Sequence, residues 1–361
     1  MKLLILTQKV DIDDDVLGFF HDWIKEFAKY YDGVTVIALS VGKYELPRNV
    51  KVLSLGKETG RSRLKYLFRF YKYIWRERKN YDQVFVHMNP EYVVLGGMFW
   101  RRQKKKIGLW YTHRAVDLKL RLAARLADII FTASKESFRL TSKKVKVVGH
   151  GINIDRFKPA SPEPRVKGDK IFRIIYVGRV SRIKNQKLLI EALDVLTNKW
   201  NLKNIRLDLI GPVSNQQDEN YKNDLGKMLQ KMRLENYVNF LGSLPYRQMP
   251  GIYNQADLSV NLCPTGGVDK AVLEAMACGL PVIVFNKTFL DILSDYREKL
   301  ILQVCDRNEL AGKIKEIMGS DFKKREEIGG KLREIAGRNC SLGSLVKVLI
   351  SNLHEINQRK N

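Results

Sequence analysis

The chain has 361 residues, 45% of them hydrophobic, and this length is typical of two folded domains rather than one. No stretch approaches the roughly 18 consecutive apolar residues of a membrane-spanning helix, which argues against an integral membrane protein. The four cysteines show neither CxxC spacing nor the pattern of a disulfide framework. We therefore expect reduced thiols in a cytoplasmic protein.

The net charge of +25 is unevenly distributed, because residues 1–160 hold 32 Lys and Arg against 16 Asp and Glu. A positive field of this size attracts polyanions such as nucleic acid, anionic lipid or phosphorylated small molecules. The alternative is that the excess of lysine serves only solubility.

Short, almost continuously apolar runs recur along the chain and predict β-strands covered on both faces. The first apolar run is too short for the core of a signal peptide, which favours a first strand instead. Helical patterns lie between the runs, for example at 186–196 and 223–232. The predicted strands are 3–7, 35–39, 50–55, 83–87, 107–112, 128–132 and 145–148 in the first half, and 172–177, 205–210, 237–241, 258–262, 281–285 and 300–304 in the second.

The alternation of strands and helices predicts an α/β protein with two Rossmann-like, doubly wound parallel sheets that face a cleft. Residues 157–170 contain three prolines, a glycine and few apolar side chains, which indicates a linker. We therefore predict an N-terminal domain at 1–165, a second domain at 166–340 and a C-terminal helix at 341–361 that crosses back to the first domain.

A cluster of carboxylates follows the first predicted strand, at residues 11–15. Carboxylate clusters bind hard cations, so a metal site is one interpretation. A solvated loop is the interpretation we favour, because the cluster directly follows a strand of the first domain. We expect no metal site in the protein.

Residues 61–81 predict an amphipathic helix with an apolar face opposite a basic one. A second basic cluster at 99–106 follows an apolar run. Basic helices rich in aromatic residues bind anionic membranes, so we expect peripheral membrane attachment through these two segments. The alternative is an ordinary core helix with a basic solvent face. The apolar face comprises Leu64, Leu67, Phe68, Tyr71, Ile74 and Trp75, and the basic face Lys65, Arg69, Lys72, Arg76 and Lys79.

Ligands of open α/β sheets bind beyond the carboxyl ends of the strands. One predicted strand ends at Val177, after which Gly178 allows a turn and Arg179 and Lys184 follow. A guanidinium fork and a lysine point charge suit a diphosphate.

A second strand end leads into the sequence TGGVDKAVLEAMACGLPVIV, residues 265–284, which predicts a loop, a helix at 270–277 and a buried strand. Asp269 is a candidate N-cap. Lys270 then lies at the helix end where the dipole disfavours a cation, unless an anion binds in front of it. Glu274 lies four residues later on the same face. The alternative is an ordinary surface pair between Lys270 and Glu274.

Four segments together resemble the group 1, family 4 retaining glycosyltransferases in their order and spacing. The resemblance covers residues 105–350 and implies the GT-B fold with a nucleoside-diphosphate sugar as donor. It implies transfer of the sugar to an acceptor hydroxyl with retained configuration, without a metal or other cofactor. We expect a lipid-linked saccharide or cell-envelope glycan as acceptor, at the inner face of the membrane. The segments are VGRVSRIKNQKLLIEAL, YVNFLGSLPYRQMPGIYNQADLSVNLCP, DKAVLEAMACGLPVIV, and ADIIFTASKESFRL followed by KVKVVGHGINIDRFKP.

By position, the resemblance assigns the donor diphosphate to Arg179 and Lys184 and the nucleotide ribose to Glu274. It places His113 near the donor sugar and acceptor, although a strand-end histidine bonded to backbone is the alternative. We place His87 and His21 on the acceptor side. The remaining donor-binding positions are Gly178, Gly266, Gly267, Val268, Asp269 and Lys270, with Leu241 and Gly242 near the base.

One position departs from the family pattern, because Gly266 stands where the first glutamate of the Glu–seven residues–Glu motif is expected. Asp269 either supplies a carboxylate in its place or is only a helix cap. A catalytically impaired nucleotide-sugar-binding protein is therefore the alternative to an active transferase. A nucleic-acid-binding protein is supported by charge alone, and we expect no nucleic-acid partner because the aromatic residues lie on helical faces.

Overall fold

The computed structural model describes residues 1–60, 62–160 and 171–358. The chain forms two compact units, the first comprising Met1–Gly151, Pro245–Arg247 and Leu342–Asn361, and the second Ile152–Leu244 and Gln248–Ser341. The boundary predicted after residue 165 falls outside the described residues, and the chain divides after Gly151 instead.

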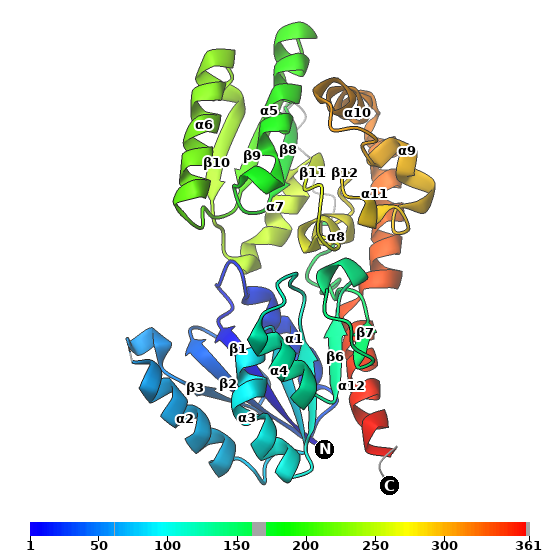
Figure 1. The fold of residues 1–361 in the computed structure, drawn as a ribbon. Coiled ribbons are helices and arrows are strands. Elements are labelled where there is room, and N and C mark those ends of the chain that lie inside the picture. The colour runs from blue at the N-terminus through cyan, green and yellow to red at the C-terminus, as the bar shows by residue number, and fades with distance from the viewer. Residues whose placement is uncertain (61, 161–170, 359–361) are drawn as a thin grey trace. The chain divides into compact units, whose positions relative to one another are not determined.

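The first unit is built on a seven-stranded parallel sheet of order β3-β2-β1-β4-β5-β6-β7 (Figure 1). Each strand is a short, nearly continuous apolar run, as expected where helices cover both faces of a parallel sheet. The strands are β1 Lys2–Val10, β2 Gly33–Val41, β3 Val50–Ser54, β4 Gln83–His87, β5 Lys106–Trp110, β6 Ile129–Thr132 and β7 Val145–Val147.

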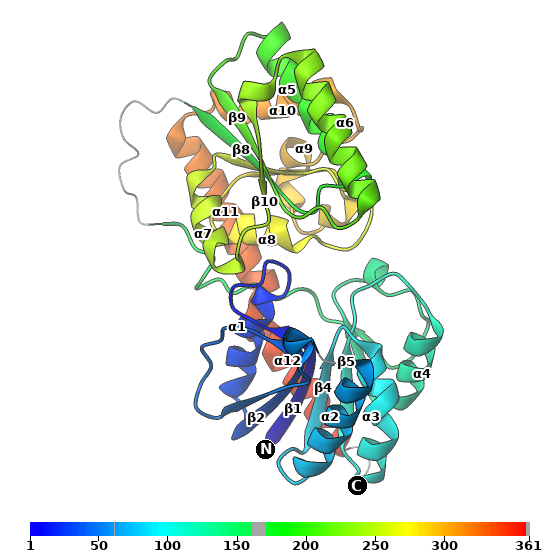
Figure 2. The same ribbon diagram turned by 90° about the vertical axis from the view of Figure 1, so that its left-hand side faces the viewer.

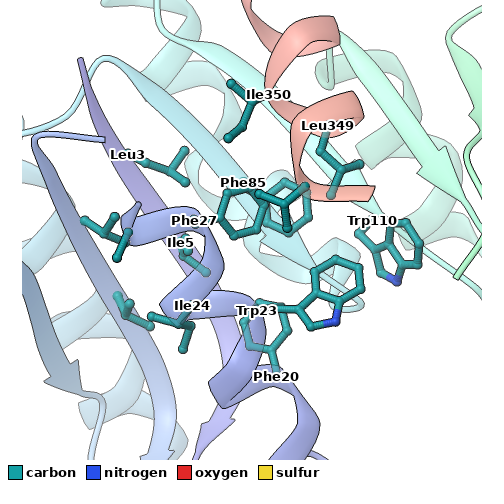
Figure 3. Packing of buried hydrophobic residues seen from close by; sticks show 14 of the residues in the cluster. Leu3, Ile5, Phe20, Trp23, Ile24, Phe27, Phe85, Trp110, Leu349 and Ile350 are labelled. Carbon is teal, nitrogen blue, oxygen red and sulfur yellow. The ribbon is translucent and has the colours of Figure 1, made fainter. Parts of the chain in front are cut away.

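Alternate residues of β1 enter two separate cores. Leu3 and Ile5 pack in a cluster with α1 and α12 (Figure 3), whereas Leu4 and Leu6 pack in a cluster with residues of α2, α3 and α4. This alternation follows from the two-residue period of a strand. The helices are α1 Gly18–Ala28, α2 Arg63–Arg76, α3 Pro90–Arg102, α4 Leu118–Leu126 and α12 Leu342–Gln358.

The C-terminal helix α12 belongs to the first unit. In the sequence, however, residues 152–341, nearly all of which form the second unit, lie between α12 and the N-terminal part of the first unit. Its side chains Leu345, Val346, Leu349 and Leu353 are buried in the same cluster as Phe27 of α1. Figure 3 shows Leu349 and Ile350 beside Phe85 and Trp110. The chain therefore returns to the first sheet at its C-terminal end.

The second unit has a five-stranded parallel sheet of order β10-β9-β8-β11-β12 (Figure 1). Helix α8 packs against α7 and α11, and α5 packs against α6 and α10. The predicted α/β class with two doubly wound parallel sheets is confirmed. The strands are β8 Phe172–Val177, β9 Ile205–Ile210, β10 Val238–Gly242, β11 Leu258–Asn261 and β12 Val282–Val284; the helices are α5 Gln186–Asp194, α6 Gln216–Met232, α7 Met249–Gln255, α8 Lys270–Ala277, α9 Arg297–Leu300, α10 Arg307–Gly319 and α11 Phe322–Cys340.

The strand predicted at 300–304 is wrong. Residues 297–300 form the short helix α9, and Ile301 makes only an isolated parallel bridge to Val284. The apolar run Leu300, Ile301 and Leu302 is buried. Its apolar composition therefore reflects burial and not strand formation.

Candidate functional site

The candidate site lies where the strand order of the second sheet reverses. The chain passes from β8 to β9 and β10 on one side of β8, and then returns to β11 and β12 on the other side. The connections that leave β8 and β11 therefore diverge, and a crevice at this place is the usual ligand site of a doubly wound sheet. The segment 178–184 follows β8, and the segment 262–270 follows β11.

Backbone hydrogen bonds donated by two glycines join the ends of β8, β9 and β10. The N–H of Gly178 donates to the carbonyl of Ile210 (2.8 Å), and the N–H of Gly211 donates to the carbonyl of Gly242 (2.8 Å). A Cβ on Gly211 would lie 2.2 Å from the carbonyl oxygen of Gly178, and the φ angle of Gly211 is +145°. Only glycine permits both this backbone conformation and this approach. The turn that carries Arg179 and Lys184 is therefore held against the end of β9.

Lys184 is positioned by a buried tyrosine of β8. The Tyr176 hydroxyl donates to the backbone carbonyl of Lys184 (2.5 Å) and accepts from the N–H of Leu262 (3.3 Å), which follows β11. The side chain of Lys184 runs beside Gly178, where a Cβ would lie 3.7 Å from its Cε. One hydroxyl thus joins the two segments that leave β8 and β11.

The ammonium of Lys184 is paired with a carboxylate at the start of α8. Its Nζ lies 2.5 Å from Oδ2 of Asp269, and the same oxygen accepts from the amide of Asn261 (2.9 Å). Burial alone would lower the pKa of Lys184, but the charge and hydrogen bond of Asp269 raise it. Burial alone would raise the pKa of Asp269, but the charge of Lys184 and the hydrogen bonds from Lys184 and Asn261 lower it. Both groups are charged at neutral pH.

Asp269 is also the N-cap of α8, since its Oδ1 accepts from the N–H of Ala271 (3.3 Å). The predicted helix at 270–277 and its predicted cap are both confirmed. The carboxylate therefore does two things at once, because one oxygen caps the helix and the other binds the lysine.

Arg179 also has a carboxylate near it. Its Nε lies 3.6 Å from Oδ2 of Asp218, which is buried in the first turn of α6, while the Arg179 side chain is half-exposed. The positive charge of Arg179 lowers the pKa of Lys184, but this effect is outweighed by the Asp269 carboxylate. The sequence predicted two cations facing an anion, and the structure adds a carboxylate to each of them.

Lys270 and Glu274 form the third pair, on one face of α8. The Lys270 Nζ lies 3.9 Å from Oε1 of Glu274, and the Glu274 Oε2 accepts from the hydroxyl of Tyr253 (3.2 Å). The Glu274 side chain is only 6% exposed, so this is not an ordinary surface pair. Burial, together with the nearby charge of Glu274, raises the pKa of Tyr253 well above its usual value and keeps the hydroxyl as a donor.

The glycine loop before α8 is held by an asparagine of another segment. The amide of Asn286 donates to the carbonyls of Gly266 (3.4 Å) and Gly267 (3.3 Å). In a trans peptide the N–H points away from the carbonyl, so the N–H groups of Gly267 and Val268 point away from Asn286. The φ angle of Gly266 is +118°, a conformation that a glutamate at this position would rarely adopt.

The two positions predicted to lie near the nucleotide base, Leu241 and Gly242, make fewer contacts that bear on their predicted role than the positions predicted to bind phosphate. Leu241 at the end of β10 is exposed, and Gly242 is bound through its carbonyl to Gly211. The predicted roles of both positions remain predictions, since the structure gives them only a place at the same edge of the sheet.

The three histidines of the prediction lie in the first unit. His87 ends β4, is buried, stacks on Phe20 with ring centroids 3.9 Å apart, and places Nδ1 3.3 Å from the Thr7 hydroxyl. His21 is also buried, and its Nε2 accepts from the N–H of Glu45 (3.0 Å). Both side chains are thus held by contacts within the first unit.

His113 differs from the other two because it is exposed, in the connection between β5 and α4. Its Nδ1 accepts from the N–H of Ala115 (3.1 Å). His113 is thus the strand-end histidine bonded to backbone that we considered as the alternative. Its other ring nitrogen, Nε2, takes no part in this hydrogen bond and remains available to contact a substrate.

The acidic cluster at residues 11–15 forms a loop organised by a lysine. The Lys9 ammonium lies 2.6 Å from Asp14 and 3.2 Å from Asp11, and Asp14 also accepts from the N–H groups of Val16 and Leu17. Burial opposes ionisation of Asp14, yet these hydrogen bonds lower its pKa. Among the described residues no group of three or more His, Cys, Asp or Glu side chains is arranged to hold a metal ion.

Several residues of the site were missed by the sequence analysis. Gly211 had a signal in the sequence, because it follows β9 directly, as Gly178 follows β8. The others are polar or aromatic residues with no local pattern to single them out; four lie inside elements, and Asn286 lies in the connection after β12. They are Tyr176, Asp218, Tyr253, Asn261 and Asn286.

One family model matches a part of the chain that lies mostly in the second unit. Residues 157–334 match the family model described as glycosyl transferases group 1. Among curated proteins, the chain is 25% identical over 204 residues to a mannosylfructose-phosphate synthase of Agrobacterium fabrum, covering 55% of this chain and 44% of that protein. It is 26% identical over 205 residues to the putative glycosyltransferase EpsD of Bacillus subtilis, covering 53% and 51%. The chain thus matches about half the length of these relatives.

Comparison with solved structures extends over nearly the whole chain. Anabaena Alr3699/HepE in complex with UDP superposes with a TM-score of 0.74 at 20% identity, covering 98% of this chain and 100% of that one. A sucrose-phosphate synthase from Thermosynechococcus elongatus superposes with a TM-score of 0.71 at 17% identity, covering 100% of both chains. At these identities the likeness concerns the fold, and it confirms the GT-B fold expected from the sequence.

No helix in the described part of the chain has the length and apolar character needed to cross a membrane.

Proposed function

We propose that the chain transfers a sugar from a nucleoside-diphosphate sugar to an acceptor hydroxyl, because residues 157–334 match the family model of the group 1 glycosyltransferases. The observation that carries the proposal is the convergence of Arg179, Lys184 and the start of α8 at the reversal point of the second sheet. A structural neighbour in complex with UDP-glucose supports a nucleotide sugar as donor.

The proposed chemistry needs positive charge where the leaving diphosphate develops negative charge. Arg179, Lys184 and the N–H groups of Gly267 and Val268 supply it as fixed groups, which stabilise a transition state without reorganisation. Fixed cations of this kind replace a divalent metal, so we propose a metal-independent reaction. Glu274 would bind the nucleotide ribose, with its orientation set by Tyr253.

The carboxylates beside the cations set a condition on donor binding. Asp269 occupies one hydrogen-bonding direction of the Lys184 ammonium, which has three N–H donors. A phosphate oxygen would therefore bind a remaining N–H donor of Lys184, while Asp269 keeps the ammonium in place. The Nε of Arg179 lies farther from its carboxylate, at 3.6 Å from Oδ2 of Asp218. The Arg179 guanidinium would therefore turn toward the phosphate more easily than the Lys184 ammonium.

We further propose retention of configuration and a lipid-linked or cell-envelope glycan as acceptor, with His113, His87 and His21 on the acceptor side. The exposed position of His113 supports it as the one of the three that meets substrate. The buried stack of His87 on Phe20 and the backbone bond of His21 support a structural part for those two.

The test begins with binding. Isothermal titration with UDP, UDP-glucose and GDP-mannose should show saturable binding of one nucleotide class, and Arg179→Ala and Glu274→Ala should weaken it. Arg182→Ala is the matched control, because Arg182 lies in the same turn but is exposed and paired with Asp224. Absence of binding for every nucleotide sugar would refute the proposal.

Turnover then separates the transferase from an impaired binding protein on the same scaffold. For the transferase we expect release of nucleoside diphosphate from the bound donor when acceptors from a lipid extract are added. The release should persist in the presence of EDTA, which removes divalent metals. Binding without any release of nucleoside diphosphate would favour the impaired binding protein, for which the glycine at Gly266 is the supporting observation.

A further inference from the structure

Helix α2 turns its aromatic stripe toward solvent. Phe70 and Ile74 are buried against the sheet, and Tyr66 and Tyr73 are partly buried beside them. Of the six residues of the predicted apolar face, Ile74 is buried and the other five are exposed. Leu64, Phe68, Tyr71 and Trp75 are 78%, 71%, 43% and 59% exposed.

The exposed side chains form one continuous line. Their spacing of four, three and four residues places them on a single face of the helix. At 1.5 Å per residue, the line from Leu64 to Trp75 is about 16 Å long. An apolar line of this length, turned to water, is unusual on a soluble surface and marks an interaction site.

Cations lie beside the aromatic line on the same solvent-facing half of α2. Lys65, Lys72 and Arg76 are exposed and follow a parallel helical row, and Lys79 continues the row beyond the helix end. Glu77 is the carboxylate of this segment, and it is buried in pairs with Lys51 and Arg76. The exposed half of α2 is therefore apolar and positive.

Helix α3 continues the same surface. The two helices lie side by side on one face of the first sheet (Figures 1 and 2), where the Tyr71 hydroxyl donates to the carbonyl of Leu95 (3.2 Å) and the rings of Trp75 and Phe99 are 5.9 Å apart. Met98 is 57% exposed, and the end of α3 adds the exposed Arg101 and Arg102.

We propose that this α2–α3 face, comprising Leu64, Phe68, Tyr71, Trp75 and Met98 with the adjoining cations, docks on an anionic lipid bilayer. The aromatic and aliphatic side chains would enter the boundary between headgroups and acyl chains, and the lysines and arginines would contact anionic headgroups. The inference names where the proposed enzyme would meet a lipid-linked acceptor. It rests on the proposed function only for that acceptor, because docking itself needs no donor.

Charge decides between a membrane and a second copy of the chain. A symmetric dimer would bring the same surface patch of both copies together. The row of cations on α2 would then face its own copy without carboxylates to balance it. An anionic surface satisfies the apolar line and the cations together.

The experiment is cosedimentation with vesicles in the absence of nucleotide. We expect binding to vesicles that contain phosphatidylglycerol and much weaker binding to phosphatidylcholine alone, with each removed lysine lowering affinity about fivefold. Phe68→Ser with Trp75→Ser should abolish binding. The matched control is Phe322→Ser with Val304→Ser, two similarly exposed apolar residues of the second unit, which should bind as the unaltered protein does.

A charge series provides the second comparison. Lys65→Gln, Lys72→Gln and Lys79→Gln together should lose binding, whereas Lys227→Gln, Lys231→Gln and Lys324→Gln, equal in charge change and exposed on the second unit, should lose far less. Equal losses in the two sets would show a general charge effect and overturn the assignment of this face.

Tryptophan quenching locates the contact directly. Trp23, Trp100 and Trp110 are buried, Trp75 is exposed on the proposed face, and the partly exposed Trp200 lies in the second unit, which does not include that face. Brominated lipids, which quench at short range, should quench the emission of the unaltered protein but not that of Trp75→Phe, which keeps an aromatic ring. No quenching in the unaltered protein on bound vesicles would refute the docking.

Two other occupants have their own outcomes. A dimer in sedimentation velocity that Phe68→Ser with Trp75→Ser dissolves would overturn the proposal in favour of a second copy. Binding to duplex DNA that outcompetes the vesicles would overturn it in favour of nucleic acid. Unchanged UDP binding by the same double variant separates failure of docking from failure of the proposed function.

Discussion

The ammonium of Lys184 lies 2.5 Å from the carboxylate of Asp269, so a residue predicted to bind phosphate is already held by an internal counter-charge. The pair joins the turn after β8 to the start of α8. About one-fifth of each side chain is exposed, which leaves it within reach of a ligand. The pair is therefore both a structural link and the place where a diphosphate would compete for charge.

Changing each partner alone should have opposite effects on nucleotide affinity. Lys184→Gln removes a charged donor to phosphate, and we expect UDP binding to weaken by about 10- to 100-fold, since a hydrogen bond to a charged group contributes about 1.5–3 kcal/mol. Asp269→Asn removes a negative charge near the phosphates but still caps α8, because Asn is as good an N-cap as Asp. We expect it to tighten UDP binding a few-fold. Calorimetry on both variants measures this, and equal weakening by both would show that Asp269 only orients the lysine.

The same pair should make stability depend on pH in a defined direction. The pKa of Asp269 is lowered from 3.8 in the folded protein, so its contribution is complete above about pH 4 and is lost as the pH falls through the folded value. The pKa of Lys184 is raised from 10.5, so its contribution is complete below that pH and is lost as the pH rises further. Urea unfolding of the unaltered protein and of Asp269→Asn should differ by about 1.5–3 kcal/mol at pH 7 and converge below pH 4. A difference that does not change with pH would mean that the carboxylate contributes without its charge.

Much of this fold could be predicted, because parallel strands covered on both faces are continuous apolar runs. The helix at 270–277 was also predictable to the residue, since Asp269 and Gly279 mark its ends. The orientation of α2 was not, because aromatic residues lie almost all round that helix. The predicted apolar face includes the buried Ile74, but its other members, from Leu64 to Trp75, are exposed.

The site was predictable in its cations but not in their partners. Arg179, Lys184 and Lys270 follow strand ends, and ends of parallel strands meet at one edge. Asp218 and Asn261 come to that edge from elements whose place depends on the order of strands in the sheet. That order depends on packing of the whole unit, which no local pattern in the sequence expresses.

The close approach of two strand ends gives a test of the site's architecture. Gly211→Ala would place a methyl carbon 2.2 Å from the Gly178 carbonyl, and the backbone must move to relieve it. We expect a loss of about 1–3 kcal/mol in stability and weaker nucleotide binding, because the turn that carries Arg179 and Lys184 is displaced. Gly226→Ala is the control, since a Cβ there meets no atom within 4 Å and Gly226 lies inside α6. Helix propensity predicts a gain of about 0.5–1 kcal/mol for the control, measured by urea unfolding. A Gly211→Ala protein with unaltered nucleotide affinity would contradict this account.

The return of α12 to the first unit can be tested with two adjacent residues. Leu349 is fully buried in the cluster around α1, whereas its neighbour Val348 is 42% exposed. Leu349→Ala should lower the free energy of unfolding of the first unit by about 2–5 kcal/mol, because it leaves a cavity in a packed core. Val348→Ala should change it by less than about 0.5 kcal/mol. Trp23 and Trp110 are buried in the same cluster, so their fluorescence reports the first unit. Equal effects of the two substitutions on that signal would show that α12 does not pack there in solution.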